Sequence, residues 1–382
     1  MSLYWKSFKD ILIRLLTKPI WMMLFISLAL MGLVYMNQTI RDLPVAVIDL
    51  DHSTTSRDLI RQLNTSSKIE VIPYSDIPQA IADINNQKIF AAIVIPNHFE
   101  AFLMKNKDVT VLGYGDASNR LANGLIQQDI LASYKAFLAS FHNNTMRNSG
   151  FQDEQIDIIL NPIRSQTVAL FNPGANFAAI TFPGLLVMLL QHSLMIASTR
   201  TNIALHSLPQ GKPPKAVFLG SLSALVPIWL FLSIILFVLW PWVLGYRQLA
   251  SIPVILMMTF PFLFAVIGLS KLLTECLRRV EMIYLTLSFL TTPVFYLSGT
   301  IWPLEAMPTW VWCISHLLPS TWAVNMIAGV NQMGLSLSSV GFNMLMLFLL
   351  GCFYIILGLF ISGLRNGTLR QRFNFSSRSK IN

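Results

Sequence analysis

Charged residues are scarce in this chain of 382 residues: they make up 12% of it, whereas soluble domains carry about 25%. Hydrophobic residues make up 54%, and the mean hydropathy is +0.58. This composition excludes a soluble enzyme, a disordered chain and a fibrous repeat. The chain is therefore predicted to be an integral membrane protein.

The sequence also lacks the residue patterns of common catalytic sites. The three cysteines lie far apart and fit neither a disulfide framework nor a zinc site. The six histidines form no pair at metal-ligand spacing, and there is no Gly-x-Ser-x-Gly elbow. A P-loop needs G-x-x-x-x-G-K-[ST], but Gly211-Lys212 is followed by Pro213. We therefore predict no catalytic residue, metal or cofactor, and any ATP must bind to another polypeptide.

Six apolar segments are long enough to cross a bilayer, which takes about 20 residues. The first is too long for a signal peptide and lacks an Ala-x-Ala cleavage site, so we interpret it as an uncleaved anchor. None of the six contains a charged residue, which argues against an ion-driven transporter. The segments are 20–36, 177–197, 217–240, 252–270, 282–298 and 340–362, the last five forming a membrane domain over 177–362.

The positive-inside rule orients these spans. With residues 1–19 in the cytoplasm, six spans place the basic tail 363–382 there as well, together with nearly all other Lys and Arg residues outside 37–176. The short external loops carry only Arg247 and Glu305 as charged residues. The net charge of +9 is therefore a topology signal, and we expect no nucleic-acid partner.

Residues 1–19 show helical periodicity. Tyr4, Phe8, Ile11 and Leu15 fall on one face, with Lys and Arg residues between them. We predict a basic amphipathic helix in the cytoplasmic membrane interface; the alternative is a frayed basic tail.

Residues 37–176 form a polar stretch that is long enough for a domain with its own core. Short apolar runs at 44–50, 69–72, 90–95 and 109–114 alternate with amphipathic segments, which predicts an α/β layer with parallel strands. A long helix is expected over 118–146, and its apolar stripe is interpreted as core packing. The fold class is thus an α-helical polytopic membrane protein with six transmembrane helices and an inserted α/β extracytoplasmic domain.

Asp49 and Asp51 end the first predicted strand and precede His52 and Ser53. Paired carboxylates could bind a metal or act as acid and base. An Asp at a strand end more often caps the following turn or helix, and we favour this interpretation.

Residues 299–331 are apolar but contain Pro303, Pro308 and Pro319, and they are rich in tryptophan. Proline interrupts helices, and tryptophan is enriched at membrane interfaces. We predict a re-entrant segment whose short helices are broken at Pro303 and Pro308, with Glu305 at the interface; the alternative is a simple external loop.

Several motifs resemble those of one transporter family. Residues 297–308 read LSGTIWPLEAMP, similar to the L-S-G-x-x-x-P-x-x-x-M-P signature of ABC type-2 transporter permeases, and Leu318-Pro319 fits its later part. Leu170-Phe171-Asn172-Pro173 and Phe182-Pro183-Gly184 resemble the family's Y-N-P and P-G elements. The run VIDLDHS at 47–53 is similar to the branch with a large domain after span one.

This resemblance implies the permease subunit of an exporter in the bacterial cell (inner) membrane. It implies a second permease copy or related permease, cytoplasmic ABC ATPase subunits that bind ATP, and, in this branch, a periplasmic adaptor protein and an outer-membrane duct. Uncharged spans in the lipid bilayer suit an amphipathic, lipid-like or drug-like cargo. The cargo-path candidates are Ser298, Gly299, Pro303, Glu305 and Pro308.

The segment between spans two and three is the candidate contact with the ATPase. It carries basic residues and no acid, so its partner surface should be acidic, and prolines should end a short helix over about 199–207. The family pattern here is R-E-x-E-x-G-T, whereas residues 200–207 read RTNIALHS. Because these acids are missing, a heterodimer with a related permease is one alternative. A second alternative is that the segment is a basic loop that meets anionic lipid. The coupling candidates are Arg200, Thr201, His206 and Lys212.

Two further functions compete with export. One is a non-transporting sensor or docking protein that binds an external ligand through residues 37–176. The other is a membrane enzyme that uses His192 or His206, for which only the presence of these histidines argues.

Overall fold

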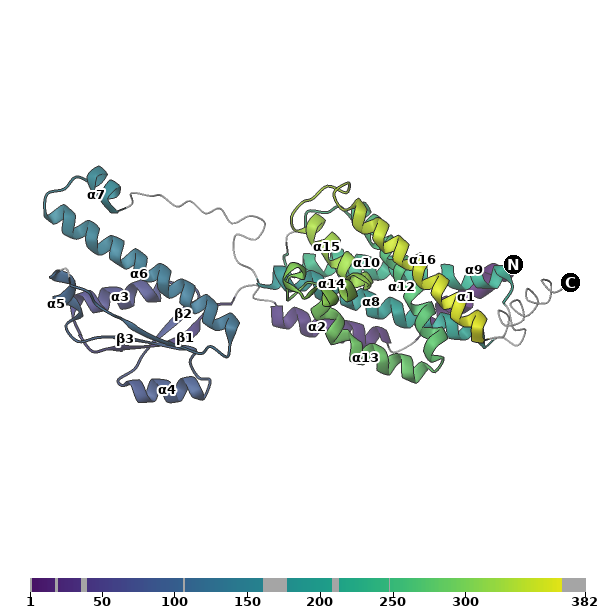
Figure 1. Cartoon of the computed structure of the whole chain (residues 1–382), viewed down its shortest axis with the longest axis horizontal. Coiled ribbons are helices and arrows are strands. Elements are labelled where there is room, and N and C mark those ends of the chain that lie inside the picture. Colours follow the sequence, from purple (N-terminus) through teal and green to yellow (C-terminus); the bar gives the residue numbers. More distant parts are fainter. Residues whose placement is uncertain are drawn as a thin grey trace, which may run out of the picture. The chain divides into compact units, whose positions relative to one another are not determined.

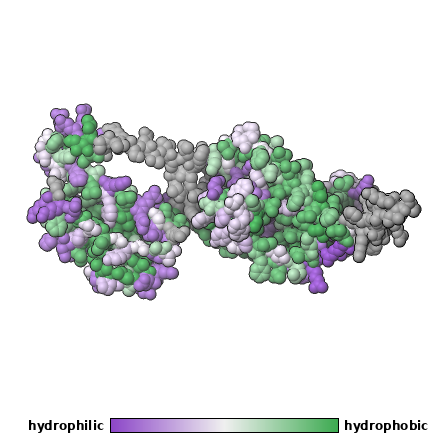
Figure 2. All heavy atoms as spheres, in the orientation of Figure 1, coloured by the Kyte–Doolittle hydropathy of each residue, from purple (hydrophilic) through white to green (hydrophobic). Residues whose placement is uncertain are grey.

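The computed structural model describes residues 2–17, 20–35, 40–105, 107–160, 177–207, 213–246 and 248–365. The chain forms two compact units (Figure 1). One comprises Thr39–Val168 and contains the β-sheet; the other combines Met1–Gln38 with Ala169–Asn382 and is helical. Figure 2 shows a largely hydrophobic surface on the helical unit and a mixed surface on the other.

The sheet has the strand order β2-β1-β3-β4 within the described residues. β1 (Leu43–Asp49) pairs in parallel with β2 (Ile69–Pro73) and β3 (Ala91–Ile95), because α3 (Thr54–Asn64) and α4 (Ile77–Asn85) return the chain between strands. β4 (Leu112–Gly115) runs antiparallel to β3, so the prediction of parallel pairing is wrong for this strand. Only the six-residue α5 (Phe99–Met104) separates the two strands, and β4 starts at the end where β3 stops.

Helices cover both faces of this sheet. Since side chains alternate along a strand, Val45 and Val47 of β1 pack in one apolar cluster with α3 and α6 (Arg120–Asn148). Ala46 and Ile48 pack in a second cluster with α4. The apolar stripe of α6 is core packing, as predicted, since its Ile126 lies in the first cluster. The short α7 (Asp153–Leu160) follows.

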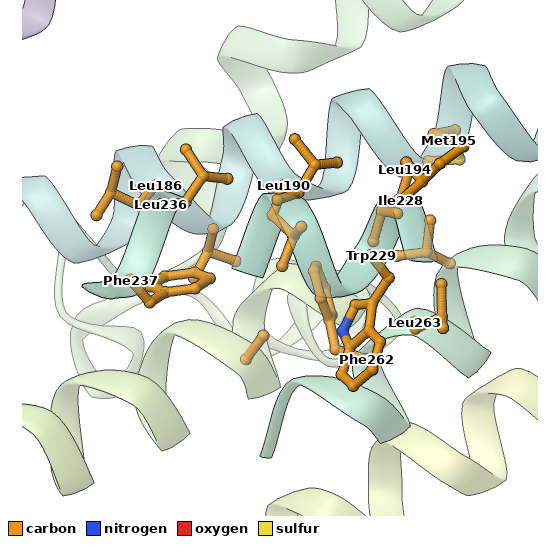
Figure 3. Close-up of a cluster of buried hydrophobic side chains, with 14 of the residues drawn as sticks. Leu186, Leu190, Leu194, Met195, Ile228, Trp229, Leu236, Phe237, Phe262 and Leu263 are labelled. Carbon is orange, nitrogen blue, oxygen red and sulfur yellow. The ribbon is translucent and has the colours of Figure 1, made fainter. Parts of the chain in front are cut away.

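The helical unit is built from the chain on both sides of the sheet-containing segment. Because α8 contributes buried leucines along its whole length, it lies at the centre of a core that α10 and α12 complete (Figure 3). The elements are α1 (Leu3–Leu16), α2 (Ile20–Tyr35), α8 (Phe177–His206), α9 (Lys215–Ser223), α10 (Leu225–Ile234), the π-helix η1 (Ile235–Leu239), α11 (Trp240–Val243), α12 (Ile252–Leu277), α13 (Val280–Leu297), the 3-10 helix η2 (Leu304–Ala306), α14 (Thr309–His316), α15 (Pro319–Asn331) and α16 (Gly341–Arg365).

In the part of the chain that the structure describes, four helical stretches are long and apolar enough to cross a membrane. They are Thr181–His206, Lys215–Val243, Ile252–Leu277 and Gly341–Arg365. The other two predicted spans coincide with shorter apolar helices, α2 of 16 residues and α13 of 18 residues. Six spans therefore remain a prediction.

Helix α1 packs against α9 through the face that the sequence indicated. Ile11 and Leu15 are buried there, and the Tyr4 hydroxyl donates to Ser223 Oγ at 2.8 Å. A Cβ at Gly220 would lie 2.5 Å from the Tyr4 carbonyl oxygen, so the two helices touch at backbone distance. The apolar face predicted to enter the membrane interface is thus covered by protein, whereas Trp5 and Leu16 of α1 are exposed.

In the segment 299–331, prolines start helices instead of breaking them. Pro303 precedes η2, Pro308 precedes α14 and Pro319 is the first residue of α15. This is the position at which proline's missing N–H costs least. Short helices separated at Pro303 and Pro308 are therefore present, as predicted, and neither proline lies inside a helix.

Candidate functional site

The C-terminal end of α8 carries a run of buried polar residues. α8 continues without a break through Ser198, Thr199, Thr201 and Asn202 to His206, and the first four are buried. The prediction of a separate short helix over 199–207 is therefore wrong. Three of the buried polar side chains, those of Thr199, Thr201 and Asn202, are hydrogen-bonded on the same helix or on α12.

Ser270 of α12 is the partner of two of these residues. Its Oγ lies 3.0 Å from Thr199 Oγ1 and accepts a bond of 3.4 Å from Asn202 Nδ2. Ser270 is fully buried, so these contacts fix the register between α8 and α12. We call Thr199, Asn202 and Ser270 the Ser270 junction.

Four ionisable side chains lie together beyond the Ser270 junction. We call them the Glu275 cluster: Glu275 and Lys271 of α12, His206 of α8 and Arg365 of α16. The Glu275 carboxylate is 0% exposed, and its Oε1 lies 2.5 Å from Lys271 Nζ and 2.8 Å from His206 Nε2. Arg365, the last residue of α16, donates to the Glu275 carbonyl oxygen at 2.8 Å. Three helices therefore meet at one buried acid.

The predicted coupling residues have different environments. Arg200 donates from Nε to the Tyr284 hydroxyl of α13, and its guanidinium carbon lies 5.5 Å from that ring. Thr201 is buried and donates to the Ala197 carbonyl at 3.0 Å. His206 belongs to the Glu275 cluster, and Lys212 lies outside the described residues. Arg200 and Thr201 are thus occupied inside the helical unit.

The site residues that the sequence did not predict are Glu275, Lys271, Ser270 and Tyr284. One signal was present: Lys271 and Glu275 are four residues apart directly after the apolar run 252–270, the spacing of an ion pair on one helix face. Their contact with His206, by contrast, joins residues far apart in the chain. It depends on how α8 and α12 pack.

The Leu-Ser-Gly signature forms a tight turn after α13. Ser298 is buried, and its Oγ donates to the Phe295 carbonyl at 2.7 Å and lies 2.8 Å from Thr300 Oγ1. Gly299 has a φ of +86°, a conformation that favours glycine. Glu305 and Pro308 are exposed. Gly184 packs against Thr300, so the Pro-Gly element of α8 and the signature turn are in direct contact.

This contact gives a prediction. A Cβ at Gly184 would lie 2.1 Å from Thr300 Oγ1 and 2.8 Å from Thr300 Cβ, so Gly184→Ala should lower stability by about 1–3 kcal/mol. Thr300→Gly should restore much of the loss when combined with it, because it removes Oγ1, Cγ2 and Cβ, the three Thr300 atoms within 2.8 Å of the added Cβ. Thermal unfolding of both variants in detergent checks this; equal destabilisation with and without Thr300→Gly would contradict it.

A cavity of about 130 Å³ lies among α8, α12 and α13. Its lining is apolar apart from Gln191, His192 and Thr291, and Leu318 of the signature also borders it. His192 Nδ1 lies 3.3 Å from Thr291 Oγ1. The buried Gln191 Oε1 has no hydrogen-bond partner among the described residues. The cavity is thus an apolar space bordered by Gln191, whose buried amide oxygen makes no hydrogen bond within the described residues.

Asp49 is a capping residue. Its Oδ1 accepts the backbone N–H groups of Asp51 and His52 at 3.1 and 3.0 Å, and its Oδ2 accepts from Ser56 Oγ at 2.7 Å. The pKa of Asp51 is lowered: burial raises it, but hydrogen bonds from Ser53 and from backbone groups outweigh burial. Asp51 is therefore a poor proton acceptor. No group of three or more metal-ligating side chains occurs within the described residues.

We therefore predict that Asp49→Ala lowers stability and does not abolish a chemical step. The expected loss is about 1–2 kcal/mol, because a cap and a buried hydrogen bond disappear together. Differential scanning calorimetry of the whole chain checks this, with Asp58→Ala as the control, since Asp58 makes only an exposed pair with Arg61. Equal effects of the two variants would contradict the capping role.

Comparison with known proteins connects this geometry to one family. The sequence pattern described as "ABC-2 family transporter protein" matches residues 19–360. The curated protein "ABC transporter G family member 20" from Dictyostelium discoideum is 22% identical over 307 residues, which cover 78% of this chain and 41% of that protein. The chain thus spans less than half the length of this relative.

The family match includes α8, the signature turn and the Glu275 cluster except Arg365. It confirms the resemblance to ABC type-2 permeases, although not the branch with a large external domain. With its apolar helices, the protein is a multi-pass membrane protein. The chain belongs to the ABC-2 family of transporter proteins.

Proposed function

We propose that the chain is the permease subunit of an ATP-driven exporter, with ATP hydrolysed by a separate ABC subunit. The family match carries this proposal. No P-loop pattern occurs in these 382 residues, so in this proposal ATP binds outside them. The family also supports a second permease, identical or related, beside this one. A periplasmic adaptor and an outer-membrane duct are further expected partners in a bacterial inner membrane.

The cavity among α8, α12 and α13 supports the cargo class. Its apolar lining suits an alkyl chain or a ring system, and Gln191 offers an acceptor to a single hydroxyl or amine donor. We propose a lipid-like or drug-like amphipathic cargo that passes along α8 toward Leu318 and the signature turn.

Co-purification with an ABC ATPase and cargo-stimulated ATP hydrolysis test this function. Fluorescent lipid analogues with and without a hydroxyl in the headgroup serve as probes. Stimulation should be greater for the hydroxylated probe, and Gln191→Leu should abolish that difference. A chain that copurifies with no ATPase, or an ATPase indifferent to every probe, would contradict the proposal.

We further propose six spans, with both termini cytoplasmic and the Thr39–Val168 unit outside. Cysteine labelling tests this topology in a background without the native cysteines. Ser67→Cys, which replaces an exposed serine, should react from outside, and Ser376→Cys from the cytoplasm. Reaction of both from the same side would contradict the topology.

A sensor or docking protein remains the second candidate, and one observation favours it. A cavity of about 220 Å³ lies between β4 and α6 in the Thr39–Val168 unit, lined by groups such as Tyr114, Asn123 and Gln127. A sensor would bind its ligand there without moving cargo. Transport that survives Asn123→Leu with Gln127→Leu would argue against this cavity as the main site.

A further inference from the structure

Helix α8 lacks the acidic residues of the family pattern, but an acid from another helix lies beside its last turn. Residues 200–207 contain no Asp or Glu, but His206, in the last turn of α8, lies 2.8 Å from the carboxylate of Glu275. That carboxylate is fully buried, whereas the His206 side chain is 44% exposed. The negative charge at the end of α8 is thus supplied by α12.

Helix α16 also contacts Glu275. Arg365 of α16 donates to the Glu275 carbonyl oxygen, and Gly358 of α16 packs against Lys271 and Leu272, its added Cβ falling 3.2 Å from Lys271 Cγ. The Glu275 cluster therefore joins α8, α12 and α16 through side-chain and backbone contacts. Sliding α8 along α12 would separate His206 from the buried Glu275 carboxylate and Thr199 from the buried Ser270 hydroxyl, which is costly. Sliding α16 would break the bond from Arg365 to the Glu275 carbonyl oxygen.

The Ser270 junction makes the same connection further inside the unit. Thr199 and Ser270 are fully buried and lie 3.0 Å apart at their hydroxyl oxygens. Two polar ties, one helical turn or more apart along α12, restrain both sliding and rotation of α8 on α12. A single tie would leave rotation free.

We propose that Glu275 is the positioning residue at the cytoplasmic end of α8: its carboxylate joins His206 of α8 to α12 and its backbone carbonyl holds Arg365 of α16, so that the three helices move as one body when the ATPase acts. This inference rests on the proposed function, since it states which helices the ATPase movement reaches. The ATPase then pushes a bundle instead of a single helix end.

The first test uses charge relocation. In proteoliposomes with the co-purified ATPase, Glu275→Gln should lower the amount of fluorescent lipid analogue moved per ATP by about tenfold, within the range that coupling between sites ordinarily spans. Adding the acid back on α8, as His206→Glu with Glu275→His, should restore the ratio. Glu281→Gln is the control, since this acid at the start of α13 is exposed. A ratio unchanged in Glu275→Gln, or not restored by the exchange, would overturn the proposal.

The second test does not depend on removing Glu275. Thr199→Cys with Ser270→Cys, in a background without the native cysteines, places two thiols where hydroxyl oxygens are 3.0 Å apart. Oxidation should lock α8 to α12, and the locked protein should still transport the probe at the rate of its reduced form. Loss of transport on oxidation, reversed by dithiothreitol, would show that α8 must move against α12 and would overturn the proposal. If the unaltered chain does not transport the probe at all, the proposed function itself would be contradicted.

Discussion

Replacing Gly268 by leucine is expected to prevent α12 and α16 from packing. A Cβ at Gly268 would lie 2.6 Å from the Gly351 carbonyl oxygen and 3.2 Å from its Cα. Both are backbone atoms, so no side chain can turn aside and the helices must separate. The cost should reach at least about 3 kcal/mol, the upper end for overpacked cores, and little monodisperse protein should survive size-exclusion chromatography in detergent.

Gly341 provides the matched control for this prediction. It is the first residue of α16, and a Cβ there meets no atom within 4 Å. Gly341→Leu should therefore leave the elution profile unchanged. Gly268→Leu protein that elutes and melts like the unaltered chain would contradict the close α12–α16 contact.

Removing the two side chains that contact the Glu275 carboxylate is expected to destabilise the protein more than removing the carboxylate itself. Lys271→Met combined with His206→Phe leaves a carboxylate that is 0% exposed without either partner, whereas Glu275→Gln leaves a lysine 20% exposed and a histidine 44% exposed, which water can reach. The double variant should lose about 3–5 kcal/mol, as when a buried pair loses one side.

Thermal unfolding followed by fluorescence-detected size exclusion ranks these variants. The melting temperature should be highest for the unaltered chain, lower for Glu275→Gln, and lowest for Lys271→Met with His206→Phe. Glu281→Gln should match the unaltered chain, because that acid is exposed. A melting temperature of Glu275→Gln below that of the double variant would contradict this account of the cluster.

The sequence predicted where apolar helices lie better than where they end. The run 177–197 predicts the apolar part of α8, but the helix continues to His206 because Thr199 and Asn202 are bonded to Ser270 of another helix. Composition alone shows only that these residues are polar. Their burial depends on contacts between residues about 70 positions apart in the chain.

The strands show the same limit. β1 and β3 follow from their apolar runs, and Ser53 caps α3 by accepting the Ser56 N–H at 3.0 Å. The direction of β4 does not follow from its own residues. It depends on the short path of α5, which keeps the chain at one end of the sheet.

For the candidate site, the sequence located the right helix end but not its contacts within the chain. Arg200 was expected to meet an acidic ATPase surface, yet it donates to Tyr284 of α13. Only two residues, Arg278 and Arg279, separate α12 from α13, and this tight link keeps the start of α13 beside α12. That proximity is a property of the folded chain, so no local pattern signals it.

The central claim is that this chain moves an amphipathic molecule at the expense of ATP hydrolysed by another subunit. Its most direct test measures movement of a fluorescent lipid analogue across proteoliposomes that contain the chain and the ATPase that co-purifies with it. The account predicts movement that requires ATP and stops when the P-loop lysine of the ATPase is replaced. Movement at the same rate without ATP, or ATP hydrolysis with no movement of any probe, would contradict it.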